Sequence, residues 1–191
     1  ALYRNGADVQ ALPRVTPYRD YMRWLTSRDA AAARSAWRDA FAAFEEPSRI
    51  APATTAPAVP DTLRIDLPDA LVQSLTRLTR GIGVTLNTVV QAAWGLLLGR
   101  LTHRRDVAFG TTVSGRPPEL AGVEQMVGLF INTLPLRLQW RPEESVRELL
   151  LRLQGEQSAL LDHQHLGLTE IQRLAGHGEL FDTLVVFENF P

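Results

Sequence analysis

The stretch VGLFINTLPLRL, residues 127–138, decides the fold because it combines a strand pattern with residues that a buried strand does not need. Apolar residues of high strand propensity occupy most of its positions. Asn132 and Thr133 lie in the middle of the expected strand, and Pro135 removes one backbone N–H donor. A buried amide must find hydrogen-bond partners. Either the two polar side chains stabilise a bulge or a neighbouring strand, or they line a polar passage through the core.

The segment before this stretch has a similar combination of a strand and polar residues. Residues 106–114, DVAFGTTVS, have the composition of a strand, and the loop that follows contains two prolines and two glycines. A Ser-Gly-Arg turn with Ser114 and Arg116 could hold a polar substrate through a hydroxyl, a free N–H and a guanidinium. The alternative is an ordinary turn in which Arg116 forms a structural ion pair. The residues alone leave both interpretations open.

The rest of the chain predicts an α/β fold. An alternation of apolar and charged residues at 63–67 and an apolar run at 182–187 predict two further strands. Residues 86–101 are apolar on nearly every side, which predicts a helix buried in a layered core. Other helices are expected at residues 17–28, 29–45, 69–80, 142–161 and 168–175, and a proline-rich connector at 51–60. The order of elements favours a two-layer sandwich of a sheet on helices.

Composition excludes several classes of function. The 191 residues carry a net charge of −1, which gives no electrostatic argument for binding nucleic acid. The absence of cysteine and lysine excludes a cysteine nucleophile and a Schiff-base lysine. Two of the four histidines, His163 and His165, are spaced poorly for one metal without a third ligand. We therefore expect neither a metal site nor a catalytic histidine in this chain.

The apolar runs are short. No stretch near the amino terminus has the apolar core of a signal peptide. The most apolar run, residues 89–98, is too short to span a bilayer. We expect a cytoplasmic protein with no membrane segment.

Four strings resemble the motifs of condensation domains of nonribosomal peptide synthetases. PYRDYMRWL at 17–25 is similar to the Y-x-D-Y-x-x-W motif, and VEQMVGLFINTLPLRL at 123–138 contains the V-G-x-F-x-N-T signature. DHQHLGLTEIQ at 162–172 resembles H-Q-x-x-P-F, and LFDTLVVFENFP at 180–191 resembles the strand that ends in E-N-Y/F-P. These motifs occur in the family's order.

The resemblance implies a chloramphenicol acetyltransferase-like lobe. The family's H-H-x-x-x-D-G motif does not occur in the chain. The chain then corresponds to the carboxy-terminal half of a condensation domain, with inter-lobe helices and a connector at 1–60 and an incomplete lobe at 61–191. The implied reaction forms an amide between a donor acyl or peptidyl thioester and an acceptor aminoacyl thioester. The implied partners are the amino-terminal lobe, donor and acceptor carrier proteins bearing phosphopantetheine, and a downstream adenylation domain. The chain itself binds no cofactor directly.

The resemblance also implies site residues. Residues 110–128 correspond to the family's floor loop, so Ser114 and Arg116 would face or brace the substrate tunnel, and Asn132 and Thr133 would lie along it. No catalytic residue is expected in this chain, which we predict to be inactive alone. The string at 163–171 departs from the family, because His165 stands where an acidic residue is usual. A docking module for carrier proteins without chemistry, or a lone acyltransferase of the same superfamily, are the alternatives.

Overall fold

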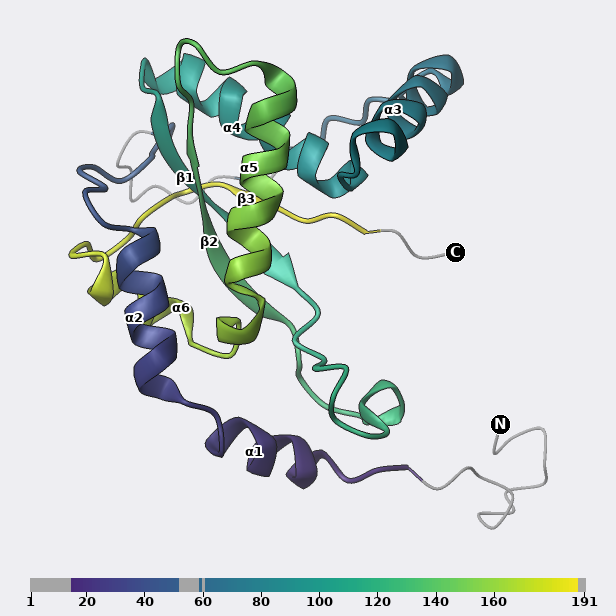
Figure 1. The fold of residues 1–191 in the computed structure, drawn as a ribbon, viewed down its shortest axis with the longest axis vertical. Coiled ribbons are helices and arrows are strands. Elements are labelled where there is room, and N and C mark those ends of the chain that lie inside the picture. Colours follow the sequence, from purple (N-terminus) through teal and green to yellow (C-terminus); the bar gives the residue numbers. More distant parts are fainter. Residues whose placement is uncertain (1–14, 52–58, 60, 189–191) are drawn as a thin grey trace.

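The structure is a computed structural model that describes residues 15–51, 59 and 61–188 (Figure 1). Most of the connector expected at 51–60 lies outside the described residues. The helices and strands, in chain order, are α1 (Tyr18–Thr26), α2 (Ala30–Ala40), α3 (Asp69–Ile82), α4 (Leu86–Thr102), β1 (Asp106–Val113), η2 (Val123–Gln125), β2 (Asn132–Gln139), α5 (Val146–Ala159), η3 (Leu161–His163), α6 (Leu168–Leu174) and β3 (Leu184–Val185).

The described strands form one sheet in the order β2-β1-β3. β1 and β2 run antiparallel, with Asp106 opposite Gln139 at one end and Val113 opposite Asn132 at the other. β3 runs parallel to β1 and pairs at Gly110. A side chain at Gly110 would meet the Phe181 ring at 2.6 Å, so only glycine allows this close packing. The mixture of helices with this sheet confirms the predicted α/β class.

Alternate residues of β1 serve two cores on opposite faces of the sheet. Phe109 belongs to the core that α4 and α5 cover, together with Leu136 and Leu153. Ala108 points to the other face, where it joins the core that includes Trp37 from α2. Helices therefore cover β1 and β2 on both sides, with α2 and α6 opposite α4 and α5 (Figure 1). The core that includes Trp37 contains residues from before and after residue 60. The division of the chain at residue 60 into inter-lobe helices and a lobe stays a prediction.

A smaller unit extends from one end of β1 and β2. α1 and the loop that carries η2 lie together, away from the sheet (Figure 1). They share a separate core in which Tyr21 contacts Val123, Met126 and Phe130. We call residues 15–28 and 114–131 the arm, and the remaining described residues the body. The arm has four buried hydrophobic residues in its core, against ten and nine in the two cores of the body.

Two predicted strands are wrong in whole or in part. Residues 63–67 form no strand, and Leu63 and Ile65 are 85% and 72% exposed. An alternating segment becomes a strand only where another strand pairs with it, and no described strand lies beside this one. β2 begins at Asn132, so residues 127–131 are not part of it. Asn132 and Thr133 consequently lie at the start of the strand, where we expected its middle.

Other boundaries differ by a few residues. α2 ends at Ala40, before the expected end, although Phe41 and Phe44 beyond it are buried as the pattern required. α5 begins at Val146 because Ser145 and Glu148 form a capping box. α4 was expected to be buried all round, but Leu101 is 55% exposed. β3 has only two residues.

Among the described residues, no single helix is long and apolar enough to cross a membrane. α3 and α4 pass the same criteria of length and composition only as a pair, with a 105° bend between them.

Candidate functional site

The four residues predicted to form the site lie close together at one end of the β1–β2 pair. The register places Val113 opposite Asn132 and Thr112 opposite Thr133. Ser114 and Arg116 follow β1 directly, so the chain leaves and re-enters the sheet at this point. Antiparallel pairing therefore brings together residues that are 16 to 19 positions apart in the chain.

The Ser-Gly-Arg turn has a backbone that requires glycine. Gly115 has a φ of +61°, and a Cβ there would lie 1.8 Å from the carbonyl oxygen of Phe130. The Ser114 hydroxyl accepts a hydrogen bond from the Arg116 N–H at 3.4 Å. The turn thus brings the loop main chain next to the segment that leads into β2.

Arg116 points back into the arm. Its guanidinium donates to the carbonyl oxygens of Val123 and Met126, the latter at 3.3 Å. It also lies over the Phe130 ring, 4.0 Å from the ring centroid. None of the ion pairs found among the described residues involves Arg116, contrary to the ion-pair alternative. The side chain holds the loop in shape through main-chain carbonyls.

Asn132 connects the start of β2 to the segment between η3 and α6. Its Nδ2 donates to the carbonyl oxygens of Gln164 and Leu166 at 2.7 and 3.1 Å. The β1–β2 register is continuous to Asn132, so no bulge occurs there. The Asn132 amide therefore hydrogen-bonds backbone groups, as the structural alternative required. These groups belong to the segment between η3 and α6, and not to a bulge or a neighbouring strand.

Three further polar side chains meet where the arm joins the body, and sequence reasoning did not select two of them. The Nε1 atom of Trp24, the Nε atom of Arg28 and the Nε2 atom of His165 are buried without a hydrogen-bond partner among the described residues. The Arg28 guanidinium lies 4.9 Å from the centroid of the Trp24 ring. The sequence signals for this junction were the position of Trp24 in its motif and the departure from the family pattern at His165.

The environment of His165 favours the neutral imidazole. Burial lowers the pKa of its imidazole, and the charges of Arg28 and His163 lower it further, although a hydrogen bond to Asp162 opposes this. Nδ1 lies 3.1 Å from the Asp162 carbonyl oxygen and donates to it, which leaves Nε2 as an acceptor. A base at this position would be weaker than a free imidazole.

No group of three or more histidine or acidic side chains suited to a metal was found among the described residues. His177 contacts the Phe44 carbonyl oxygen at 3.1 Å, and His103 ends α4 with a φ of +55°. These positions give both histidines a structural environment.

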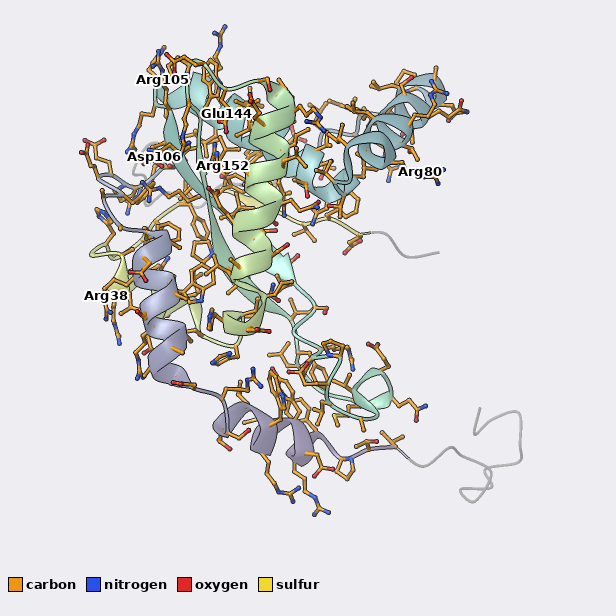
Figure 2. The ribbon with its side chains drawn as sticks, in the orientation of Figure 1. Arg38, Arg80, Arg105, Asp106, Glu144 and Arg152 are labelled. Carbon is orange, nitrogen blue, oxygen red and sulfur yellow. The ribbon has the colours of Figure 1, made fainter. Side chains whose placement is uncertain are left out.

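The opposite end of the two strands is charged, and its charges are paired. Figure 2 shows Asp106 at the start of β1, Glu144 just before the start of α5 and Arg152 in the middle of α5. Arg152 Nε lies 2.7 Å from a carboxylate oxygen of Glu144, and this bond lowers the pKa of the Glu144 carboxyl. Arg137 Nη2 lies 2.6 Å from Asp106. These residues stabilise the body and leave the polar turn at the other end as the candidate site.

Comparison with known proteins identifies the family to which the chain is similar. The chain matches the family model described as the condensation domain over residues 1–191. It is 38% identical to one of the linear gramicidin synthase proteins of Brevibacillus parabrevis over 99% of this chain, and 39% identical to surfactin synthase subunit 3 of Bacillus subtilis (strain 168) over 95%. It spans 3% and 14% of the lengths of those two relatives.

Comparison with solved structures gives a condensation-domain fold as well. The first condensation domain of the calcium-dependent antibiotic synthetase, in complex with substrate analogue 3a, matches with a TM-score of 0.75 and 27% identity. The match covers 100% of this chain and 43% of that one. The X-domain from teicoplanin biosynthesis has the same fold, with a TM-score of 0.75 at 21% identity.

Proposed function

Because this chain belongs to the condensation-domain family, we propose that it supplies one lobe of a nonribosomal peptide synthetase condensation domain. The single observation that carries the proposal is the match over the whole chain. The turn at Ser114 and the start of β2 lie side by side, which supports assigning them to one site. The reaction joins a donor thioester to the amine of an acceptor thioester. Both substrates are held on the phosphopantetheine arms of carrier proteins.

The reaction balances without a cofactor. The acceptor nitrogen attacks the donor thioester carbonyl carbon, and the new C–N bond forms as the C–S bond breaks. The amine loses one proton, and the released thiolate of the donor arm gains one. A base that handles this proton is not expected from this chain, because the sequence contains no H-H-x-x-x-D-G string and the pKa of its partly buried His165 is lowered.

In this proposal the four site residues shape the wall of the substrate channel. Arg116 is a positioning residue, since it holds the loop of residues 110–128 through main-chain carbonyls and the Phe130 ring. Asn132 is a second positioning residue, since it joins β2 to the segment around Gln164. Ser114 and Thr133 are the hydroxyl groups nearest to the turn that could contact substrate. The remaining partners are the amino-terminal lobe and an adenylation domain downstream.

The first experiment tests whether the lobe needs the rest of the domain. The chain is mixed with donor-loaded and acceptor-loaded carrier proteins, and the dipeptide is measured by mass spectrometry. We expect no dipeptide from the chain alone and turnover from the complete domain. Dipeptide formed by the chain alone would contradict the assignment of roles.

The second experiment changes Arg116 to Met in the complete domain. A loop displaced by about 1 Å can cost roughly 100-fold in rate, so we expect condensation to slow by about 10- to 100-fold. Arg105→Met is the matched control, because Arg105 is exposed at the far end of β1 (Figure 2). Equal rates for Arg116→Met and wild type would rule out a positioning role for Arg116.

A docking module without chemistry is the second candidate, and the observation in its favour is the same absence of the histidine motif from this chain. The complete protein distinguishes the two. Carrier-protein binding without any dipeptide from the complete domain would favour docking.

A further inference from the structure

The arm and the body are joined mainly by the chain itself, which crosses between them at residues 28–29, 113–114 and 131–132. The core of the arm shares no buried residue with the two cores of the body. Within the part of the chain that the structure describes, no side-chain hydrogen bond or ion pair was found between the arm and the body. A region attached in this way keeps its orientation through the few side chains that meet at the junction.

The body holds residue 165 in a fixed place at this junction. The Nε1 atom of Trp37 in α2 donates to the carbonyl oxygen of His163 at 2.9 Å. The Asn132 amide donates to the carbonyl oxygens of the two residues that flank His165, at 2.7 and 3.1 Å. Three main-chain carbonyls around His165 are therefore anchored to α2 and to the start of β2, and the imidazole is a fixed point on the body.

Arg28 is the side chain that the arm brings to this point. Its guanidinium lies 4.9 Å from the centroid of the Trp24 ring in α1, and its Nη1 atom lies 3.7 Å from a carboxylate oxygen of Glu119 in the loop of the arm. Arg28 thus contacts both segments of the arm and moves with them. It is also close to His165, because the pKa of that imidazole is lowered first by burial and then by the charge of Arg28.

The contact between Arg28 and His165 contains no hydrogen bond. The Nε atom of Arg28 and the Nε2 atom of His165 are both buried, and neither has a partner among the described residues. The Nδ1 atom of His165 is occupied by the Asp162 carbonyl oxygen at 3.1 Å. A neutral ring attracts or repels a guanidinium only weakly. A charge at position 165 would change the contact directly, because a carboxylate would attract Arg28 and a second cation would repel it.

We propose that His165 is a positioning residue that sets the orientation of the arm on the body through its contact with Arg28. The arm carries the turn at Ser114 and Arg116, so the placement of that turn beside Asn132 depends on this contact. The consequence for condensation rests on the proposed function, whereas the contact between arm and body does not.

The first test measures hydrogen exchange of backbone amides in the whole chain. His165→Glu places a carboxylate beside Arg28 and should raise the protection of the amides in α1 and η2 about fivefold, the effect of a partly exposed ion pair. His165→Arg places a cation there and should lower the protection by about the same factor. The amides of β1 should exchange as in wild type, since the body keeps its cores.

Two controls make this result specific. In an Arg28→Gln background, neither substitution at position 165 should change the protection of the arm, because the coupling between two residues disappears when one partner is removed. Thr169→Glu adds a carboxylate at an exposed position in the first turn of α6 and should leave the arm as in wild type.

The second test measures condensation by the complete domain. A displaced turn misplaces the reacting groups, so His165→Arg should lower kcat about tenfold. KM should stay within about twofold, because His165 acts through Arg28 and not on substrate. The loss of kcat should disappear in the Arg28→Gln background. If the wild-type domain forms no dipeptide, the proposed function fails, and hydrogen exchange still decides the role of His165.

Unchanged protection of the arm in both His165→Glu and His165→Arg would overturn the proposal. Equal changes with and without Arg28 would also overturn it, as would changes that affect β1 as strongly as α1. If His165→Arg does not fold, His165→Glu decides alone. In an active domain, an unchanged kcat for a folded His165→Arg variant would refute the positioning role.

Discussion

The body and the arm show two ways of holding polar residues in one chain. In the body, Arg137 and Arg152 pair with carboxylates at the edge of large apolar cores. In the arm, Arg23 and Arg28 also pair with carboxylates, but the Arg116 side chain bonds main-chain carbonyls and lies over an aromatic ring, within a core of four buried residues. The body is therefore stable by burial, whereas the arm depends on a few directed contacts.

The two regions also differ in the faces that they leave uncovered. Val127, Leu129 and Ile131 follow one another at alternate positions along the arm and are 81%, 78% and 65% exposed. Phe130 between them is buried against Tyr21. An exposed apolar strip of this kind marks a contact surface. Under the proposed function, we expect this strip to face the other lobe or the substrate channel.

The largest expected effect separates the stabilities of the two regions. Phe109→Ala removes a fully buried ring from the body and should lower the free energy of unfolding by about 3–5 kcal/mol. Phe130→Ala removes a ring from the arm and should mainly cause local opening of residues 114–131. Denaturant unfolding measures the first effect and hydrogen exchange the second. Equal loss of global stability in both variants would show that arm and body unfold as one unit.

A smaller effect tests the connection at the start of β2. Asn132→Ala removes two hydrogen bonds to main-chain carbonyls and should cost about 1–2 kcal/mol in the free energy of unfolding. Thr133→Ala is the matched control, because no hydrogen bond of its side chain was found among the described residues, and it should stay within about 0.5 kcal/mol of wild type. Similar losses in the two variants would argue against a special role for the Asn132 amide.

The smallest effect concerns pH at the junction of arm and body. The pKa of His165 is lowered below its ordinary value of 6.5, first by burial and then by the charge of Arg28. The folded chain therefore binds fewer protons there than the unfolded chain, and the stability from this group is full above pH 6.5 and declines as the pH falls below it. Because the His165 side chain is partly exposed to solvent, its contribution to the pH dependence of the free energy of unfolding is small.

Thermal unfolding of wild type and His165→Gln at pH values between about 7 and 5.5 checks this linkage, in a range above the titration of ordinary carboxylates. The variant should lose less stability on acidification than wild type. Parallel curves for the two proteins would exclude His165 as the source of the pH dependence.

Local patterns predicted the parts of the fold that depend on local interactions. α1, α3 and α6 occur where periodicity and proline or glycine positions indicated them, since a helix satisfies its own backbone hydrogen bonds. β1 was predicted because its residues are both apolar and β-branched. The segment 63–67 has an equally clear pattern, and it failed because a strand is completed only by a partner.

The candidate site, like the fold, was predicted from the sequence only in part. The residue types of Ser114, Arg116, Asn132 and Thr133 marked them as candidates but left two interpretations open, and the resemblance of their motifs to the family favoured the site interpretation. The direction of each side chain could not be predicted. That Arg116 turns toward Met126, and that Asn132 reaches the carbonyl of Gln164, depends on loops that only the folded chain brings into contact.

By itself, the sequence determined the α/β class, the family, and the positions of most helices, because these follow from periodicity and short motifs. Only the tertiary structure decided where β2 begins, which atoms hold the arm, and that a cavity lies between α2, β2 and α5. Hydrogen-bond partners and cavities depend on the distance between segments remote in the chain, and no local pattern contains that distance.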